Sequence, residues 1–170
     1  MDVHEAIRTR YAVRDFRPDP LPQETILRIL EAGRLAPSQR NRQQWHFVVV
    51  QDRETLKRIG ELAPTGPYVA QAPLAVVVVM QGAKMAQVDA ARAAENMILA
   101  AWAEGVGTCW VGGIERDKVK ELLGIPPDGE IVTILPFGYP KKLSLKGKKN
   151  RKPLSEVAHR ERFGNPYSSL

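Results

Sequence analysis

Cysteine is almost absent from this sequence of 170 residues, because Cys109 is the only one. A single thiol excludes a disulfide within one chain and any pair of redox cysteines. No apolar run approaches the ~18 residues that a membrane span needs. The acidic first residues, Met1 to Glu5, lack the apolar core of a signal peptide. These absences predict a cytoplasmic protein without a membrane partner.

Recognisable catalytic motifs are also missing. The three histidines, His4, His46 and His159, stand far apart, and none has a neighbour at metal-ligand spacing. There is no G-x-S-x-G sequence and no Walker sequence. Gly105 and Gly107 follow a predicted helix and precede a predicted strand, the reverse of the order in a dinucleotide fingerprint. We therefore expect no metal site and no catalytic side chain, so any redox chemistry needs a bound cofactor.

The formal net charge of +6 is concentrated in one segment. Seven basic residues and no acidic ones lie between Lys141 and Lys152, so the remaining chain is close to neutral. Such a segment is either a solvated surface or a site for an anion. A nucleic-acid-binding domain built on it is one alternative, although a high isoelectric point does not by itself indicate nucleic acid.

Apolar periodicity predicts a chain of alternating helices and strands. The predicted helices cover residues 3–8, 23–35, 53–62, 83–104, 115–123 and 154–163, and the predicted strands cover residues 48–50, 73–80, 108–111 and 131–137. The run from Pro73 to Met80 is the most apolar of these and predicts a central strand. Asp52 is a suitable N-cap for the third helix. This layout and length indicate a single domain over residues 1–170, of the α+β or α/β class.

A polar loop without glycine precedes the first predicted strand. Its neutral hydrogen-bonding side chains are those of Ser38, Gln39, Asn41, Gln43 and Gln44. A planar ligand rich in heteroatoms needs such groups, because each buried ring nitrogen or carbonyl costs free energy unless it is paired. A polar connection at the surface is the alternative reading.

Three separated segments resemble motifs of the nitroreductase-like flavoproteins. Ile7–Phe16 (IRTRYAVRDF) is similar to the opening "RRSxRxF", and Ala36–Phe47 (APSQRNRQQWHF) to "APSxxNxQPWxF". Leu135–Pro140 (LPFGYP) and Arg151–Val157 (RKPLSEV) resemble the ending "PLGYP…RxPLxEV". Asp89–Ala101 resembles the long dimer helix of the family. The matches occur in order and span nearly the whole chain.

The resemblance implies an α+β nitroreductase-like fold, with a mainly antiparallel central sheet flanked by helices. It implies an intertwined homodimer with FMN at the subunit interface, and neither nucleic acid nor a membrane as a partner. The implied activity takes a hydride from NADH or NADPH to flavin N5, and then reduces a nitroaromatic, a quinone or a similar small molecule in a ping-pong cycle. Two alternatives are a specialised relative that fragments flavin, removes halogen or oxidises azolines, and a flavin carrier or sensor without enzymatic activity.

The resemblance also implies which residues bind the cofactor. In chain order they are Arg10, Tyr11, Ala12, Arg14, Pro37, Ser38, Gln39, Asn41, Trp110, Val111, Gly112, Gly113, Lys149 and Arg151. Arg10, Ala12 and Arg14 would hold the phosphate and the ring edge. From the partner chain, the flavin would be contacted by Pro37, Ser38 and Asn41. The backbone of residues 110–113 would pass near N5, and the last two would close on the phosphate.

The distribution of positive charge supports the phosphate site independently. A monophosphate needs two or three cations, and arginine adds bidentate geometry. Arg10, Arg14, Lys149 and Arg151 supply these cations from the two ends of the chain.

The chain departs from the family pattern in three places. Ala12 stands where the family has serine, so only the backbone amide can serve there. Gln44 stands where the family has proline before the tryptophan. The segment 62–73 is short, and the chain has no length for extra lid helices, so the sequence does not define the acceptor.

Overall fold

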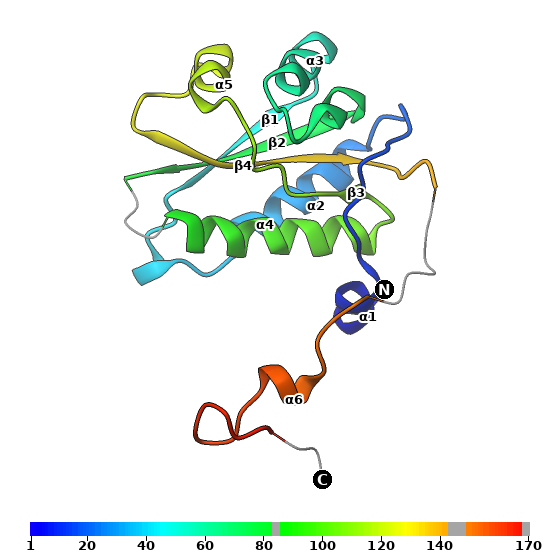
Figure 1. The fold of residues 1–170 in the computed structure, drawn as a ribbon. Coiled ribbons are helices and arrows are strands. Elements are labelled where there is room, and N and C mark those ends of the chain that lie inside the picture. The colour runs from blue at the N-terminus through cyan, green and yellow to red at the C-terminus, as the bar shows by residue number, and fades with distance from the viewer. Residues whose placement is uncertain (83–85, 143–148, 168–170) are drawn as a thin grey trace.

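The computed structural model describes residues 1–82, 86–142 and 149–167. A four-stranded sheet forms the middle layer, with α3 (Arg53–Glu61) and α5 (Arg116–Leu123) on one face and α2 (Gln23–Arg34) and α4 (Ala86–Ala103) on the other (Figure 1). This is the expected α+β arrangement. No helix in the described ranges is both long and apolar enough to cross a bilayer.

The sheet is antiparallel throughout, in the order β1-β2-β4-β3. Its strands are β1 (Trp45–Val50), β2 (Leu74–Gln81), β3 (Gly107–Thr108) and β4 (Gly129–Gly138). β2 is internal and almost wholly buried, because helices cover both of its faces. Its β-branched side chains suit a pleated surface that is packed on both sides. The prediction of an apolar central strand is confirmed.

α4 is the main support below the sheet. It packs closely against α2, because Gly33 of α2 has no Cβ atom and a Cβ there would overlap the Met97 side chain. It also contacts α1 (Val3–Thr9), and the Trp102 indole donates a hydrogen bond to Thr9 Oγ1 at 2.8 Å. The predicted start of this helix at residue 83 lies outside the described residues.

The helices above the sheet begin and end where their local sequence indicates. Asp52 caps α3 by accepting a hydrogen bond from Thr55 N at 2.8 Å. α5 ends at Gly124, whose φ of +64° suits glycine. The short 3₁₀ helix η2 (Pro67–Gln71) packs beside α3.

Two predicted elements are partly wrong. The predicted helix over 154–163 is only α6 (Leu154–Val157). Leu154, Val157 and Phe163 are exposed, so no packed apolar face supports a longer helix within the chain. Of the predicted strand over 108–111, only Thr108 belongs to β3, which pairs with β4. Residues 109 and 110 do not pair with β4, and Val111 forms an isolated bridge with Ile134.

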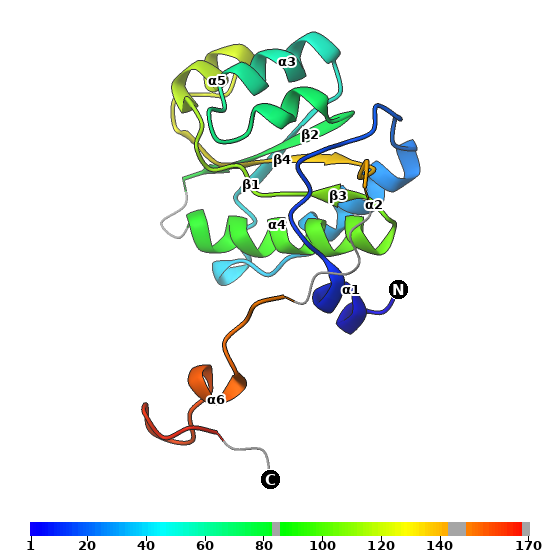
Figure 2. The same cartoon turned by 45° about the vertical axis from the view of Figure 1, so that its right-hand side comes forward.

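The segment 149–167 extends away from the three layers in both views (Figures 1 and 2). A single domain over residues 1–170 therefore stays a prediction.

Candidate cofactor site

The N-terminal segment after α1 lies beside β3. Ala12 forms a parallel bridge with Thr108, and Val13 N donates to Thr108 O at 3.0 Å. Gly107 makes this approach possible, because a Cβ atom there would overlap the Val13 side chain. Residues 10–14 therefore run alongside the segment that continues into residues 110–113. Ala12 is exposed and has only its backbone to offer a ligand.

Three cations gather where the two ends of the chain meet. Arg10 Nε lies 3.1 Å from Glu95 Oε1 of α4, and Lys149 Nζ donates to the carbonyl oxygen of Ile7. Partial burial lowers the pKa of Lys149, and the positive charges of Arg10 and Arg151 lower it further, while Glu95 acts in the opposite direction. Arg10 and Arg151 therefore lie close enough to Lys149 for their charges to act on its amine.

This cation cluster (Arg10, Lys149 and Arg151) has more positive charge than its acid neutralises. Glu95 is the single carboxylate that acts on Lys149 within the described residues, so an excess of about two positive charges remains. A phosphate monoester carries about −1.5 to −2 charges at pH 7. The cluster therefore matches the charge of one terminal phosphate.

The polar loop before β1 is held in a strained conformation. Positive φ angles occur at Arg40 (52°), Asn41 (55°) and Gln43 (52°). Left-handed backbone costs about 1–3 kcal/mol at non-glycine residues, less at asparagine, and it clusters at functional sites. Ser38 Oγ accepts from Gln43 N at 3.0 Å, and Gln39 N donates to Asp89 Oδ2 of α4 at 3.0 Å.

Gln44, which departs from the family motif, has a structural role. Its side-chain amide donates to the carbonyl oxygens of Gln81 at 3.0 Å and Gly82 at 2.7 Å. These bonds fasten the end of the loop to the end of β2. Proline at this position has no side-chain donor and would make neither bond.

The loop and the cation cluster are attached to different parts of α4. Asp89 is buried and bonds both to Gln39 N and to Arg92 Nη1, at 3.2 Å. Glu95, the partner of Arg10, lies about 9 Å further along the helix axis. Within one chain the structure therefore does not join Pro37, Ser38, Gln39 and Asn41 to the cations. Their assignment to a site shared with a second chain stays a prediction.

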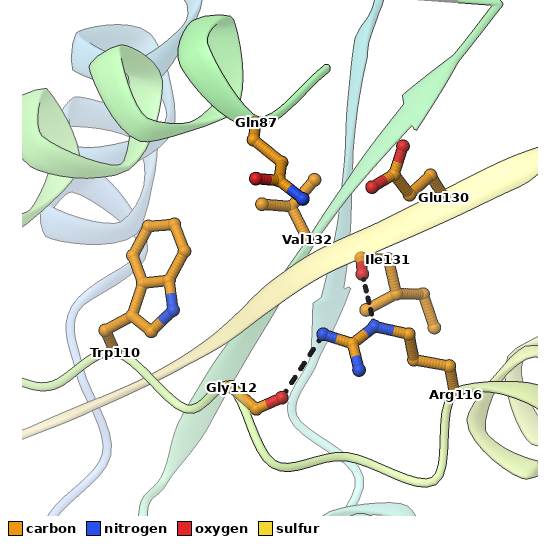
Figure 3. Close-up of a pocket in the computed structure, with 7 residues that line it drawn as sticks. All are labelled: Gln87, Trp110, Gly112, Arg116, Glu130, Ile131 and Val132. Atoms are coloured by element: carbon orange, nitrogen blue, oxygen red, sulfur yellow. Dashed lines mark hydrogen bonds between the residues drawn. The ribbon is translucent and has the colours of Figure 1, made fainter. Parts of the chain in front are cut away.

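A hollow of about 230 Å³ opens beside residues 110–113 (Figure 3). Trp110 forms one side of it and is 43% exposed, and Gln87 points into it from the start of α4. Glu130 and Val132 of β4 close the opposite side and the back. Of the four predicted residues here, Trp110 and Gly112 face open space, whereas Val111 is buried against β4.

The backbone of this segment is fixed by two side chains from other elements. Arg116 donates through Nε to Ile131 O at 2.9 Å and through Nη2 to Gly112 O at 3.2 Å (Figure 3). Gly113 N donates to Thr65 Oγ1 at 3.0 Å, and Thr65 leaves no room for a Cβ at Gly113. Two side-chain contacts thus hold the Gly112 carbonyl and the Gly113 amide in place.

Tyr11 packs against α4. Its ring and the Trp102 ring form an edge-to-face pair with centroids 5.0 Å apart, and its hydroxyl donates to Lys142 O at 3.0 Å. The Cys109 thiol donates to Tyr68 Oη at 3.0 Å. Burial and the adjacent thiol raise the pKa of Tyr68 to about 12, while Arg14 acts in the opposite direction. Burial likewise raises the pKa of the Cys109 thiol, which favours the neutral thiol over the nucleophilic thiolate.

Sequence reasoning missed the residues that position the predicted contacts. They are Thr65, Asp89, Glu95 and Arg116. Asp89 and Glu95 are acids within an alanine-rich helix, which is a detectable signal. Thr65 and Arg116 act through backbone atoms distant in sequence, and no local pattern indicates such contacts. No group of three or more metal-ligating side chains gathers in residues 1–82, 86–142 and 149–167.

Comparisons with known proteins agree on one family. The model of the Nitroreductase family matches residues 7–85 and 64–139. A protein of Archaeoglobus fulgidus, named a putative NADH dehydrogenase/NAD(P)H nitroreductase, is 37% identical over 146 residues, which are 79% of this chain and 83% of the relative. An FMN reductase [NAD(P)H] of Bacillus subtilis is 28% identical over 189 residues, or 96% and 75% of the two chains. The structure of the NfrA1 nitroreductase from B. subtilis superposes with a TM-score of 0.85 at 28% identity, covering 95% of this chain and 75% of that one.

Proposed function

The chain belongs to the nitroreductase family, and from this premise we propose that it is an FMN-dependent oxidoreductase that takes electrons from NADH or NADPH. The observation that carries the proposal is the cation cluster. Arg10, Lys149 and Arg151 have the charge for one phosphate monoester, which FMN presents at its end. The names of relatives as an FMN reductase and an NAD(P)H nitroreductase support the same cofactor and the same donors.

The residues of the site fit FMN. The three cations would hold its phosphate, and the fixed backbone of residues 112 and 113 would lie along its ring. When bound, FMN supplies the redox chemistry, by accepting a hydride from the nicotinamide and returning electrons to an acceptor.

The chain itself contributes binding and positioning. Arg116 and Thr65 restrain the Gly112 carbonyl and the Gly113 amide, so these groups need no reorganisation when a ligand arrives. Cys109 is buried and its thiol donates a hydrogen bond to Tyr68, so we assign it no redox role. The absence of a general acid or base among the side chains stays a prediction.

The dimer is part of the proposal. We infer a homodimer in which the loop of one protomer, residues 37–41, completes the site of the other. One observation supports it: the segment 154–163 extends from the body and exposes Leu154, Val157 and Phe163. Apolar side chains gathered in this way indicate a surface that another chain covers.

The proposal extends to the acceptor and to the cellular location. A nitroaromatic, a quinone or a similar small molecule would enter the hollow beside Trp110, which has about 230 Å³ of space. A ping-pong cycle follows if donor and acceptor use this space in turn. The cytoplasmic location stays a prediction, and the single cysteine supports it.

The test is the colour of the purified protein and its response to the donor. We expect a yellow protein that releases FMN, identified by mass spectrometry, and whose colour bleaches when NADH or NADPH is added without oxygen. Bound FAD, or no flavin after reconstitution, would contradict the cofactor. Bound FMN that neither nucleotide reduces would favour a flavin carrier.

A further inference from the structure

The strained loop carries positive charges that are separate from the cation cluster. Arg40 and Arg42 are exposed on either side of Asn41. Across the ranges that the structure describes, no ion pair or side-chain hydrogen bond engages either guanidinium. The neighbouring acid cannot neutralise them, because Asp89 already bonds to Gln39 N through one oxygen and to Arg92 through the other. Two uncompensated arginines therefore project from this loop.

The loop holds these arginines in a defined place. Arg40 has a φ of 52°, a conformation that the chain would leave if nothing restrained it. The bond from Gln39 N to Asp89 fixes the preceding residue, and the bond from Gln43 N to Ser38 Oγ closes the loop after Arg42. Strain that is maintained by a buried acid and a hydroxyl is typical of a binding loop.

The position of the two arginines indicates which kind of ligand they bind. Arg40 lies between Gln39 and Asn41, in the loop that reaches the flavin of the other protomer in the proposed dimer. A second molecule that approaches the flavin over this loop therefore meets a guanidinium, which suits phosphate oxygens better than any other common group. The electron donors of the proposed function carry such oxygens: both nucleotides have a diphosphate, and NADPH has an additional 2′-phosphate.

We propose that Arg40 and Arg42 bind a phosphate of the pyridine-nucleotide donor. This inference rests on the proposed function and adds the donor's binding residues to it. The contact is electrostatic and exposed, so it also predicts donor binding that weakens as ionic strength rises.

The experiment compares Arg40→Gln and Arg42→Gln with Arg58→Gln in the FMN-loaded protein. Arg58 is an exposed arginine of α3, on the far face of the sheet, and its replacement removes the same charge. KM is measured for NADPH and NADH, and calorimetry measures the dissociation constants of NADP⁺ and NAD⁺. We expect both quantities to rise about tenfold in Arg40→Gln and Arg42→Gln, the loss typical of one charge-assisted contact, and to stay unchanged in Arg58→Gln.

The outcomes are distinct. A loss restricted to NADPH and NADP⁺ places the 2′-phosphate on the loop, and an equal loss for all four nucleotides places the diphosphate there. Unchanged constants in both loop variants, or an equal loss in Arg58→Gln, overturn the inference. A wild-type flavin that neither nucleotide reduces contradicts the proposed function instead, and calorimetry still decides whether the loop binds phosphate.

Discussion

Two acids of α4 hold two parts of the site, and they do so in different surroundings. The Asp89 side chain is 6% exposed and bonds to a backbone amide as well as to Arg92. The Glu95 side chain is 46% exposed and bonds to Arg10. Removal of a buried partnered acid leaves its donors unsatisfied, whereas an exposed ion pair contributes little because water replaces it. We therefore expect Asp89 to support the loop whether or not a ligand is bound, and a bound anion to displace Glu95 from Arg10.

The largest expected effect is that of Asp89→Ala. The change leaves the Gln39 amide and the Arg92 guanidinium without their acceptor, beneath a loop whose backbone is already strained. We expect the free energy of unfolding to fall by about 3 kcal/mol. Denaturant unfolding at a fixed protomer concentration measures it. Asp89→Asn keeps one acceptor oxygen and should lose clearly less, so equal losses in the two variants would contradict this role.

Substitution of the cation cluster should affect cofactor binding and leave folding nearly unchanged. Arg10→Ala and Arg151→Ala each remove one charge-assisted contact to the phosphate, about 1.5–3 kcal/mol, or a tenfold to hundredfold loss of FMN affinity. Both residues lie outside the packed core, so the thermal midpoints of the apo-proteins should stay near that of the wild type. Quenching of flavin fluorescence during titration of the apo-protein measures the affinity. Unchanged affinity in both variants would mean that the phosphate binds elsewhere.

Glu95→Gln tests the contrast between the two acids through an expected gain of FMN affinity. Without this carboxylate Arg10 is free, and the excess positive charge of the cluster grows. FMN should bind more tightly at low salt, by about two- to fivefold, in line with an exposed ion pair of about 0.5–1 kcal/mol. The gain should disappear at high salt. Weaker binding at low salt would show that Glu95 positions Arg10 for the phosphate and does not compete with it.

The sequence predicted the main helices and strands well, but not the long-range side-chain contacts that hold the site. β2 and α2 follow local patterns, an apolar run and an amphipathic period, and the structure has both. The helix predicted over 154–163 was wrong because its apolar residues have nothing in this chain to pack against. That Lys149 lies near Arg10 was predicted from charge and family resemblance. The contact of Arg116 with the Gly112 carbonyl was not, because such a contact depends on how distant backbones happen to approach.

The smallest expected effect concerns pH and Lys149. Burial and two neighbouring cations lower the pKa of this amine below the ordinary 10.5. A bound phosphate favours the charged amine, so FMN affinity should fall as pH rises through the lowered pKa. The unfolded chain holds more protons than the folded chain between that pKa and 10.5, so the apo-protein should gain stability with rising pH over the same interval. FMN titrations and denaturant unfolding at several pH values measure the two trends in parallel. Lys149→Gln should flatten both, and trends that persist in this variant would assign them to a different group.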